Sequence, residues 1–398
     1  MELSGAIPIL AVNGGSSSLK FALFAFNPDD ERQGSEQVMA EGAIEEIGQH
    51  ESHLWVKTPS EILEDLHVSC PDWDKAVDWM LKVLTRPGLP LPLAIGHRFV
   101  SGGPHALHHQ MIGDSFQELM QQALPYAPLH VPLNMAIVEA VTQRFPDMPQ
   151  AACFDTVFHR DLPEIASRLP LPRDLWDRGM RKYGFHGLSY EYIVDTLGDR
   201  ARGRVIIAHL GNGSSLAAIS NGRSLDTTMG LTPTGGVIMG TRPGDLDPGA
   251  LLFLMNVPGY EAPQLSHVLN HLSGLMGISA MTGDMAALLA SSDPRAIQAV
   301  EMFAYSIRKA IGALTAALGG IDTLVFTGGI GEHVSAIRQK ICEPLAFCHI
   351  ELDDAANEHN ARIISRPSSL VQVAVIPTNE NLMIARHTYQ LWREYPQK

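Results

Sequence analysis

Two segments of the chain each place a glycine- and serine-rich turn between apolar runs. The first is AVNGGSSSLKFALF at residues 11–24, and the second is RVIIAHLGNGSSLAAI, which begins at Arg204. Apolar runs joined by such a turn are typical of paired β-strands. The GSSSL at Gly15 and the GSSL at Gly213 lie 198 residues apart, close to half of the 398-residue chain. This repeat predicts an internal duplication, and the length favours two domains.

A third segment, IDTLVFTGGIGEHVSAIRQKI from Ile321, predicts a buried strand, a double-glycine turn and then a helix. The segment before it, AVEMFAYSIRKAIGALTAALGG, has apolar residues at helical spacing and ends at Gly319 and Gly320, which are typical of a helix C-terminus. PLNMAIVEAVTQRF predicts another amphipathic helix. The chain therefore combines strands and helices in both halves.

Glycine- and serine-rich turns that follow strands can bind anions. Glycine lets the backbone turn its N–H groups towards a ligand, and serine hydroxyls add donors. Lys20 adds a positive charge that suits phosphate. Three such turns favour nucleotide binding, with a plain strand connection as the alternative for each turn. No lysine follows a glycine, so the P-loop pattern is absent, and neither GNGSSL nor GGIGEH has the third glycine of GxGxxG.

The composition excludes several classes of partner. The net charge is −14, from 29 basic and 43 acidic residues, whereas nucleic-acid and anionic membrane surfaces need basic patches. No apolar run reaches the roughly 18–20 residues that span a bilayer. No lysine precedes Lys20, so the basic region of a signal peptide is lacking. The four cysteines form no CxxC pair, which indicates reduced thiols. We expect a cytoplasmic protein without nucleic-acid or membrane partners.

Ten blocks of the sequence resemble, in order, those of the acetate kinases, a family of the sugar kinase, Hsp70 and actin superfamily. The blocks extend from Asn13 to Glu380 and are NGGSSSLKF, GHRFVSGG, APLHVPLN, FDTVFH, YGFHGLS, HLGNGSS, DTTMGLTP, MGTRPGDLDPG, FTGGIGE and IPTNE. The resemblance implies an α/β fold of two duplicated ribonuclease-H-like domains with an active-site cleft between them, and a homodimer. It places the first domain at residues 1–157 plus 382–398, including a returning C-terminal helix, and the nucleotide-binding domain at residues 158–381.

The resemblance also implies the activity, which is reversible Mg²⁺-dependent phosphoryl transfer from ATP to acetate, giving acetyl phosphate and ADP. Arg98 matches the arginine that binds acetate, and Arg242 and His186 match the groups that stabilise the transferring phosphoryl group. Asp155 matches an essential aspartate that is described as a proton acceptor. A carboxylic acid titrates at roughly pH 4–5, so acetate at neutral pH has no proton to lose. We expect Asp155 to orient Arg98 or a metal-bound water instead.

The other implied site residues come from the same blocks. Asn13 and Glu380 match the metal positions, for Mg²⁺ with Mn²⁺ as the alternative. The residues implied to form a small apolar acyl pocket are Val100, Leu129, Phe185 and Pro233. The residues implied to contact ATP or ADP are Ser16, Ser18, Lys20, His209, Leu210, Gly211, Asn212, Gly213, Asp284, Met285, Ala286, Gly329, Ile330, Gly331, Glu332 and His333.

Departures from the family pattern lie mostly on the nucleotide side. Asp284, Met285 and Ala286 stand where the family has Asp-Phe-Arg, and His333 replaces an asparagine. These changes bear on nucleotide preference, and a donor specificity relaxed towards GTP or pyrophosphate is one hypothesis.

Two alternative functions stay open from the sequence. The resemblance implies that Val100 favours acetate, since propionate-preferring members of the family tend to have alanine there. One methylene in an apolar pocket is worth only ~1–3 kcal/mol, so a propionate or other short-chain acyl kinase is the first alternative. A non-catalytic nucleotide-binding protein of the actin and Hsp70 type is the second. A carboxylate-binding arginine such as Arg98 counts against the second, because a pure nucleotide binder has no need of one.

Overall fold

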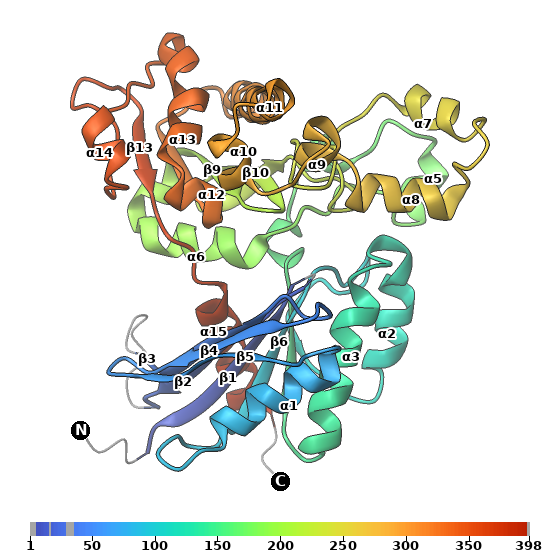
Figure 1. Ribbon diagram of the computed structural model, residues 1–398, viewed down its shortest axis with the longest axis vertical. Coiled ribbons are helices and arrows are strands. Elements are labelled where there is room, and N and C mark those ends of the chain that lie inside the picture. Colours follow the sequence, from blue (N-terminus) through green and yellow to red (C-terminus); the bar gives the residue numbers. More distant parts are fainter. Residues whose placement is uncertain (1–4, 16, 29–35, 396–398) are drawn as a thin grey trace. The chain divides into compact units, whose positions relative to one another are not determined.

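The computed structural model describes residues 5–15, 17–28 and 36–395 of the chain. The chain divides into two compact units, which we call unit 1 and unit 2 (Figure 1). Unit 1 comprises Met1–Val157 and Asn379–Lys398, and unit 2 comprises Phe158–Thr378. In the part of the chain that the structure describes, each unit has one β-sheet with helices, so both are α/β.

Among the described residues, the sheet of unit 1 has eight strands in the order β5-β4-β3-β2-β1-β6-β8-β7. Their bounds are β1 Ile7–Gly14, β2 Leu19–Phe26, β3 Gln37–Glu45, β4 Ser52–Lys57, β5 Ile62–Val68, β6 Ala94–Phe99, β7 Gln110–Met111 and β8 Gln150–Phe154. β1 is antiparallel to β2 and parallel to β6, and β6 is parallel to β8. The predicted hairpin is confirmed, since β1 and β2 flank a turn in which Gly15 N donates to Ser18 O at 2.8 Å.

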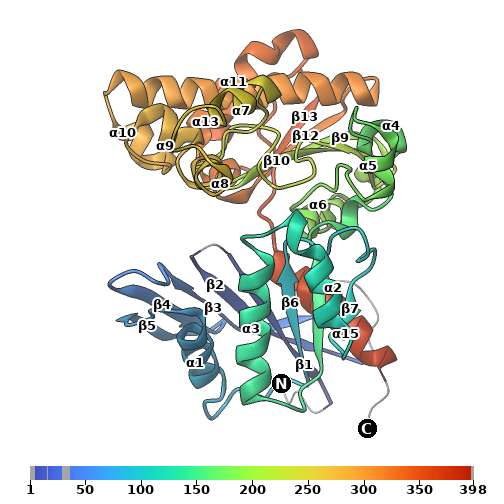
Figure 2. The ribbon, with the colours of Figure 1, turned by 90° about the vertical axis from the view of Figure 1, so that its right-hand side faces the viewer.

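Helices pack on both faces of the sheet of unit 1. Their bounds are α1 Trp73–Leu84, α2 Phe116–Ala123, α3 Val131–Arg144 and α15 Glu380–Glu394, with a 3₁₀ turn at Leu124–Tyr126. α1 and α3 pack on one face and α15 packs on the other (Figures 1 and 2). Leu10 and Val12 of β1 lie in the core formed with α1 and α3. Phe26 of β2 stacks on Tyr389 of α15, with 4.5 Å between the ring centroids. Aromatic stacking adds about 0.5–1.5 kcal/mol to the burial of the rings.

Among the described residues, the sheet of unit 2 has five strands in the order β11-β10-β9-β12-β13. Their bounds are β9 Arg204–Leu210, β10 Ser214–Ser220, β11 Arg223–Thr227, β12 Thr323–Thr327 and β13 Gln372–Val375. β9 is antiparallel to β10 and parallel to β12, and β12 is parallel to β13. The order and directions equal those of β3-β2-β1-β6-β8 in unit 1. The predicted duplication is therefore confirmed, and both sheets have the ribonuclease-H-like order of the actin-like ATPase fold.

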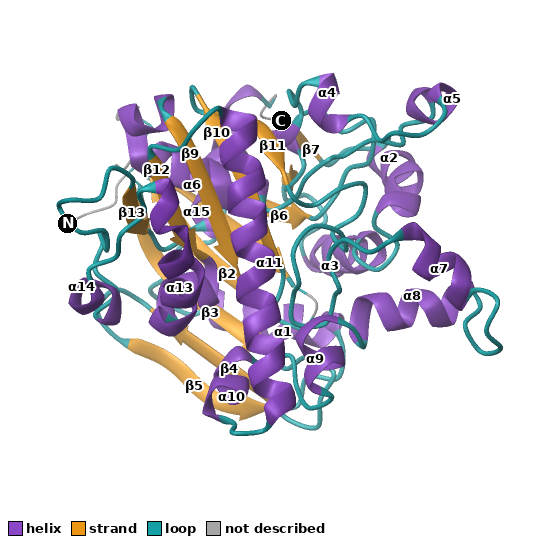
Figure 3. Ribbon diagram, turned by 90° about the horizontal axis from the view of Figure 1, so that it is seen from above, coloured by secondary structure: helices purple, strands orange, loops and turns teal. Residues whose placement is uncertain are grey.

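Most of the helices that the structure describes belong to unit 2. Their bounds are α4 Glu164–Ser167, α5 Arg173–Asp177, α6 Gly187–Leu197, α7 Pro248–Leu254, α8 Ala262–His271, α9 Gly274–Ser279, α10 Met285–Ala290, α11 Pro294–Leu318, α12 Gly328–His333, α13 Ser335–Cys342 and α14 Asp354–Glu358. The 3₁₀ turns are Val157–His159, Gly198–Arg202 and Glu343–Cys348. α11 and α13 cover one face of the sheet, where Phe303 and Ile337 lie in its core (Figure 3). Tyr190 of α6 packs on the other face.

The long helix α11 shows why the sequence folds as it does here. Asp293 caps its N-terminus by accepting from Arg295 N at 2.8 Å, and Pro294 is its first residue. It ends at Gly319, whose φ of 69° lies in the left-handed region that favours glycine. The predicted helix and its glycine stop are confirmed. No helix within the described residues is both long and apolar enough to cross a membrane.

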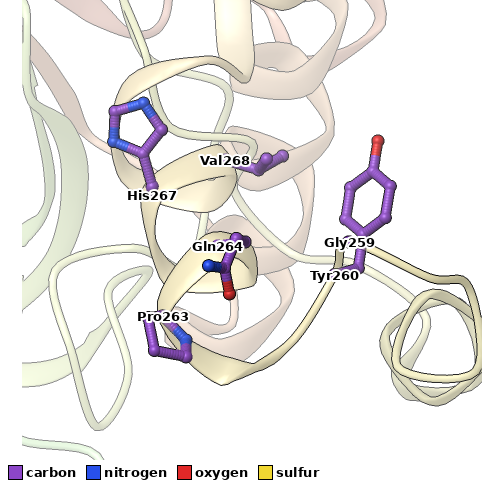
Figure 4. Close-up of a pocket in the computed structure, with 6 residues that line it drawn as sticks. All are labelled: Gly259, Tyr260, Pro263, Gln264, His267 and Val268. Carbon is purple, nitrogen blue, oxygen red and sulfur yellow. The ribbon is translucent and has the colours of Figure 1, made fainter.

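Two pockets of unit 2 contain none of the predicted site residues. One, of about 550 Å³, lies against α8 and is lined by Tyr260, Pro263, Gln264 and His267, among others (Figure 4). The other, of about 800 Å³, is lined by residues of α9 and α11 and, among others, by Gly236, Val237, Ile238, Pro243, Asp245 and Leu246.

Candidate active site

Arg98 and Asp155 form an ion pair at the carboxyl ends of two parallel strands of unit 1. Arg98 lies in β6 and Asp155 directly follows β8, so the topology brings them to one edge of the sheet. Arg98 Nε lies 3.1 Å from each carboxylate oxygen of Asp155, and Nη2 lies 2.6 Å from Oδ2. The Asp155 residue is 0% exposed. A guanidinium and a carboxylate in this fork geometry fix each other's orientation.

Asn13 connects Arg98 to Glu380. Its Oδ1 accepts from Arg98 Nη1 at 3.1 Å, and its Nδ2 donates to Glu380 Oε2 at 2.8 Å. Arg98 Nε lies 4.0 Å from the same oxygen of Glu380. Burial on its own would lower the pKa of the Arg98 guanidinium, but the carboxylates of Asp155 and Glu380 outweigh burial and hold that pKa above its ordinary value. The four side chains therefore form one network with one positive and two negative charges.

Asn379 is not among the predicted residues, yet it determines where Glu380 lies. Its side-chain oxygen accepts from Leu382 N at 3.0 Å, as the N-cap of α15. Glu380 is therefore the first residue of this helix. An asparagine directly before a helical segment is an N-cap signal, so this role could have been predicted from the PTNE stretch.

In unit 2, His186, His209 and Arg242 lie around the turn between β9 and β10. The rings of His186 and His209 stack with 4.3 Å between their centroids. Arg242 Nη1 donates to the carbonyl of Pro233 at 2.7 Å. A Cβ added to Gly213 would lie 2.8 Å from Arg242 Nη2 and 3.4 Å from His186 Nε2. The absence of a side chain at Gly213 therefore leaves room for both catalytic candidates beside the turn.

His186 has an unusual backbone conformation, with a φ of 58° just before α6. Its Nδ1 lies 2.8 Å from Ser215 Oγ. The carbonyl before it, of Phe185, accepts from His159 Nε2 at 3.1 Å, and Nδ1 of His159 lies 2.8 Å from Ser224 Oγ. Because a carbonyl only accepts, Nε2 of His159 carries the proton. His159 is not among the predicted residues, although it ends the FDTVFH block, and it anchors the backbone at His186.

The His159 ring predicts a pH dependence of stability. Burial lowers its pKa to about 4, against the hydrogen bond to the Phe185 carbonyl, which raises it. In the unfolded chain the histidine pKa is ~6.5, so the unfolded state binds more protons between these two values and stability falls as the pH falls. We expect His159 to remove roughly 2 kcal/mol of the free energy of unfolding between pH 7 and pH 5.

The matched variant is H159Q, whose amide can still donate to the Phe185 carbonyl. Urea denaturation at pH 7 and pH 5 should show a pH-dependent loss that is smaller in H159Q than in the wild type by the amount given above. An equal loss in the two proteins would contradict the assignment.

The predicted loop on the adenosine side forms α12 directly after β12. The sequence predicts a double-glycine turn before the helix, but the helix begins at Gly328 itself. Gly328 has a φ of 76°, and a Cβ there would lie 2.7 Å from the carbonyl oxygen of Leu210, so only glycine fits. Glu332 turns its carboxylate back, and its Oε1 accepts from Gly328 N at 2.8 Å and from Thr378 N at 3.1 Å. This reach-back bond satisfies the first N–H of the helix, which explains why no separate turn precedes it.

The segment 284–286 is bound into its own helix. The Asp284 carboxylate caps α10 by accepting from Ala287 N at 2.7 Å. Met285 lies in the core of unit 2, and Ala286 is exposed. The described part of this segment therefore offers no basic side chain to a nucleotide.

The predicted phosphate-binding turns of the two units differ in their surroundings. In unit 1, Lys20 is exposed on β2, Ser18 is half-buried, and Ser16 lies outside the described residues. In unit 2, the carbonyl of Asn212 accepts from Gly240 N at 3.0 Å, which ties the turn 209–213 to the loop that carries Arg242.

The four predicted acyl-pocket residues are divided between the units. Val100 is buried in unit 1, whereas Leu129 of unit 1 is 45% exposed. Phe185 and Pro233 are both buried in unit 2. Pro233 is also the residue whose carbonyl accepts from Arg242. A hydrogen bond therefore links a predicted acyl-pocket residue to a predicted catalytic residue.

Comparison with known proteins places this geometry in a family. The model of the acetokinase family matches residues 8–386. An acetate kinase of Rhodopseudomonas palustris is 42% identical over 397 residues, covering 96% of this chain and 98% of the relative. Two similar crystal structures each cover 97% of this chain and 100% of their own. They are a Porphyromonas gingivalis acetate kinase (TM-score 0.82, 37% identity) and a Francisella tularensis propionate kinase (TM-score 0.88, 33% identity). This chain belongs to the acetokinase family and is a kinase that transfers a phosphoryl group to a carboxylate.

Proposed function

We propose that this chain is an acetate kinase that interconverts ATP and acetate with ADP and acetyl phosphate. The observation that carries the proposal is the buried pair of Arg98 and Asp155 beside Glu380. A planar guanidinium held in place by one carboxylate is suited to bind a second, small carboxylate. The similar proteins that are named acetate kinase support the same acceptor.

In the proposed reaction, a carboxylate oxygen of acetate attacks the γ-phosphorus in line. The bond from that phosphorus to the β–γ bridging oxygen breaks, and ADP leaves with the electron pair. Arg98 binds acetate, and Asp155 orients the guanidinium rather than taking a proton, because acetate is already ionised. Arg242 and His186 stabilise the negative charge on the transferring group.

The donor set at Asn13 and Glu380 fits a hard divalent cation, and we assign them to Mg²⁺, with Mn²⁺ as the alternative. Glu380 supplies a carboxylate, and Asn13 Oδ1 has two lone pairs, of which one accepts from Arg98. Mg²⁺ commonly takes one or two protein oxygens and completes its shell with waters and phosphates. When bound, it would neutralise charge on the phosphates of ATP. The turn 209–213 and the segment 329–333 are assigned to ATP or ADP.

The proposal is tested by measuring which carboxylic acid accepts the phosphoryl group. With ATP, Mg²⁺ and hydroxylamine, the wild-type protein should form acyl hydroxamate from acetate, and kcat/KM should fall in the order acetate, propionate, butyrate. The propionate kinase among the similar structures makes propionate the competing acceptor, and each methylene is worth ~1–3 kcal/mol in an apolar pocket. A higher kcat/KM for propionate would move the assignment to a propionate kinase. No hydroxamate from any of the three acids would overturn it.

The finer organisation is part of the same proposal. The two domains are assigned to residues 1–157 plus 382–398 and to residues 158–381, and the chain is assigned to a homodimer in the cytoplasm, in keeping with the family. Light scattering should then give a mass about twice 43.3 kDa, whereas a mass near that of one chain would contradict the dimer.

A further inference from the structure

Arg338 of α13 is fully buried, and none of the ion pairs found among the described residues includes it. The residue is 0% exposed, and oxygens accept from all three of its nitrogens. Nε donates to Asn357 Oδ1 at 2.8 Å, and Nη2 donates to the Asn357 carbonyl at 2.7 Å and to Asn360 Oδ1 at 2.6 Å. Nη1 donates to the carbonyls of Gly331 and Glu332 at 2.8 and 3.0 Å. The five N–H groups of the guanidinium are therefore all satisfied.

A buried guanidinium is costly unless it is fully hydrogen-bonded, so its position is strongly constrained. Burial lowers the pKa of Arg338 to about 10, and the side chain therefore keeps its proton at neutral pH. Its charge faces the last carbonyls of α12, which carry partial negative charge at a helix C-terminus. The cation thus secures the end of the segment Gly328–His333, while Glu332 Oε1 secures its beginning at Gly328 N.

We propose that Arg338 is a positioning residue for the nucleotide, acting through the segment Gly328–His333. The inference rests on the proposed function in one respect, since that function assigns residues 329–333 of this segment to ATP. Arg338 and Glu332 hold the backbone of the segment in one conformation before the nucleotide binds. A preorganised site loses less conformational entropy on binding. Arg338 is therefore expected to affect ATP binding without affecting acetate, whose candidate ligand Arg98 belongs to unit 1.

The central experiment compares the wild type with R338M. The KM for ATP should rise about tenfold, whereas the KM for acetate should stay within about twofold. In the absence of substrates, the backbone amides of residues 328–333 should exchange hydrogen for deuterium faster, as measured by mass spectrometry. R338K keeps the charge but has three N–H donors in place of five, and it should give intermediate values of both quantities.

Two further variants complete the test. K340M changes a half-buried residue of the same helix whose partner is Glu301, and it should leave both quantities unchanged. N360G removes the Oδ1 acceptor, and the glycine that it introduces tolerates the φ of 50° at this position. It should raise the KM for ATP about two- to threefold. If R338M does not fold, R338K and N360G together test whether Arg338 positions the segment.

The outcomes separate the two proposals. Unchanged exchange in R338K and N360G, or equal increases in both KM values, would overturn the role of Arg338. If the wild type makes no acyl hydroxamate but the variants still exchange faster, the acceptor assignment fails and the anchoring of the segment stands.

Discussion

The variant D155N should lower kcat/KM for acetate about 10³-fold, with a similar loss at every pH from 6 to 9. Asparagine keeps the size of the side chain but not its charge, so the Arg98 guanidinium loses the carboxylate that holds it at 2.6 Å. Loss of one oriented polar group at a charged reacting centre commonly costs about 10²–10³ in rate, and about 1.4 kcal/mol corresponds to a factor of ten.

The pH profile separates the two roles of Asp155. A proton acceptor would affect only the acidic limb of the profile, so survival of activity with a change confined to low pH would contradict an orienting role. D74N is the matched control, because Asp74 also pairs with an arginine in unit 1, Arg144, but lies in α1 and is exposed. It should retain kcat/KM within about twofold, since exposed ion pairs contribute little. Thermal unfolding followed by circular dichroism then shows whether D155N is still folded, so that a loss of activity can be told from a loss of the fold.

The variant R242A should lower kcat about 10³-fold while changing the KM for acetate only a few-fold. Arg242 is held beside Gly213 and His186 by the Pro233 carbonyl. A cation that stabilises charge on the transferring phosphoryl group acts mainly in the transition state, and removal of one such group commonly costs about 10²–10³ in kcat.

The control for R242A is R202A, since Arg202 is 79% exposed in its side chain and pairs only locally with Asp199. R242K should recover little of the lost rate, because lysine has no fork to donate to both the Pro233 carbonyl and a phosphoryl oxygen. Steady-state kinetics with ATP and acetate varied in turn measure the effect. A rise in the KM for ATP with an unchanged kcat would instead make Arg242 a ground-state nucleotide ligand.

Much of the fold could be predicted from the sequence because its signals are local. The strand–turn–strand segments at Gly15 and Gly213 predict the central hairpins of both sheets, and Gly319 predicts the end of α11. The predicted turn at Gly328 and Gly329 was wrong, because both glycines belong to α12, where Gly328 N donates to Glu332 Oε1. β4 and β5 were not predicted, since an alternating pattern at a sheet edge is a weak signal.

The candidate site was predictable to the extent that its residues lie in recognisable blocks. Arg98, Asp155 and Glu380 do, and the structure brings them together. His159 and Arg338 were missed as positioning residues because no local pattern indicates which groups their side chains contact. His159 bonds to Ser224, 65 residues away, and no pattern in a single sequence predicts such a pair.

The return of α15 to unit 1 has a consequence for the order in which the protein is made. A ribosome synthesises all of unit 2 between Val157 and Asn379. Unit 2 can therefore complete its sheet while unit 1 still lacks the helix that covers one face, including Tyr389 against Phe26. Glu380 arrives on the same helix, so the charge network of Arg98 is completed only when that face of the sheet is covered. Nascent unit 1 must keep this apolar face from aggregating until late in translation, and the assembly of its site coincides with the closure of its core.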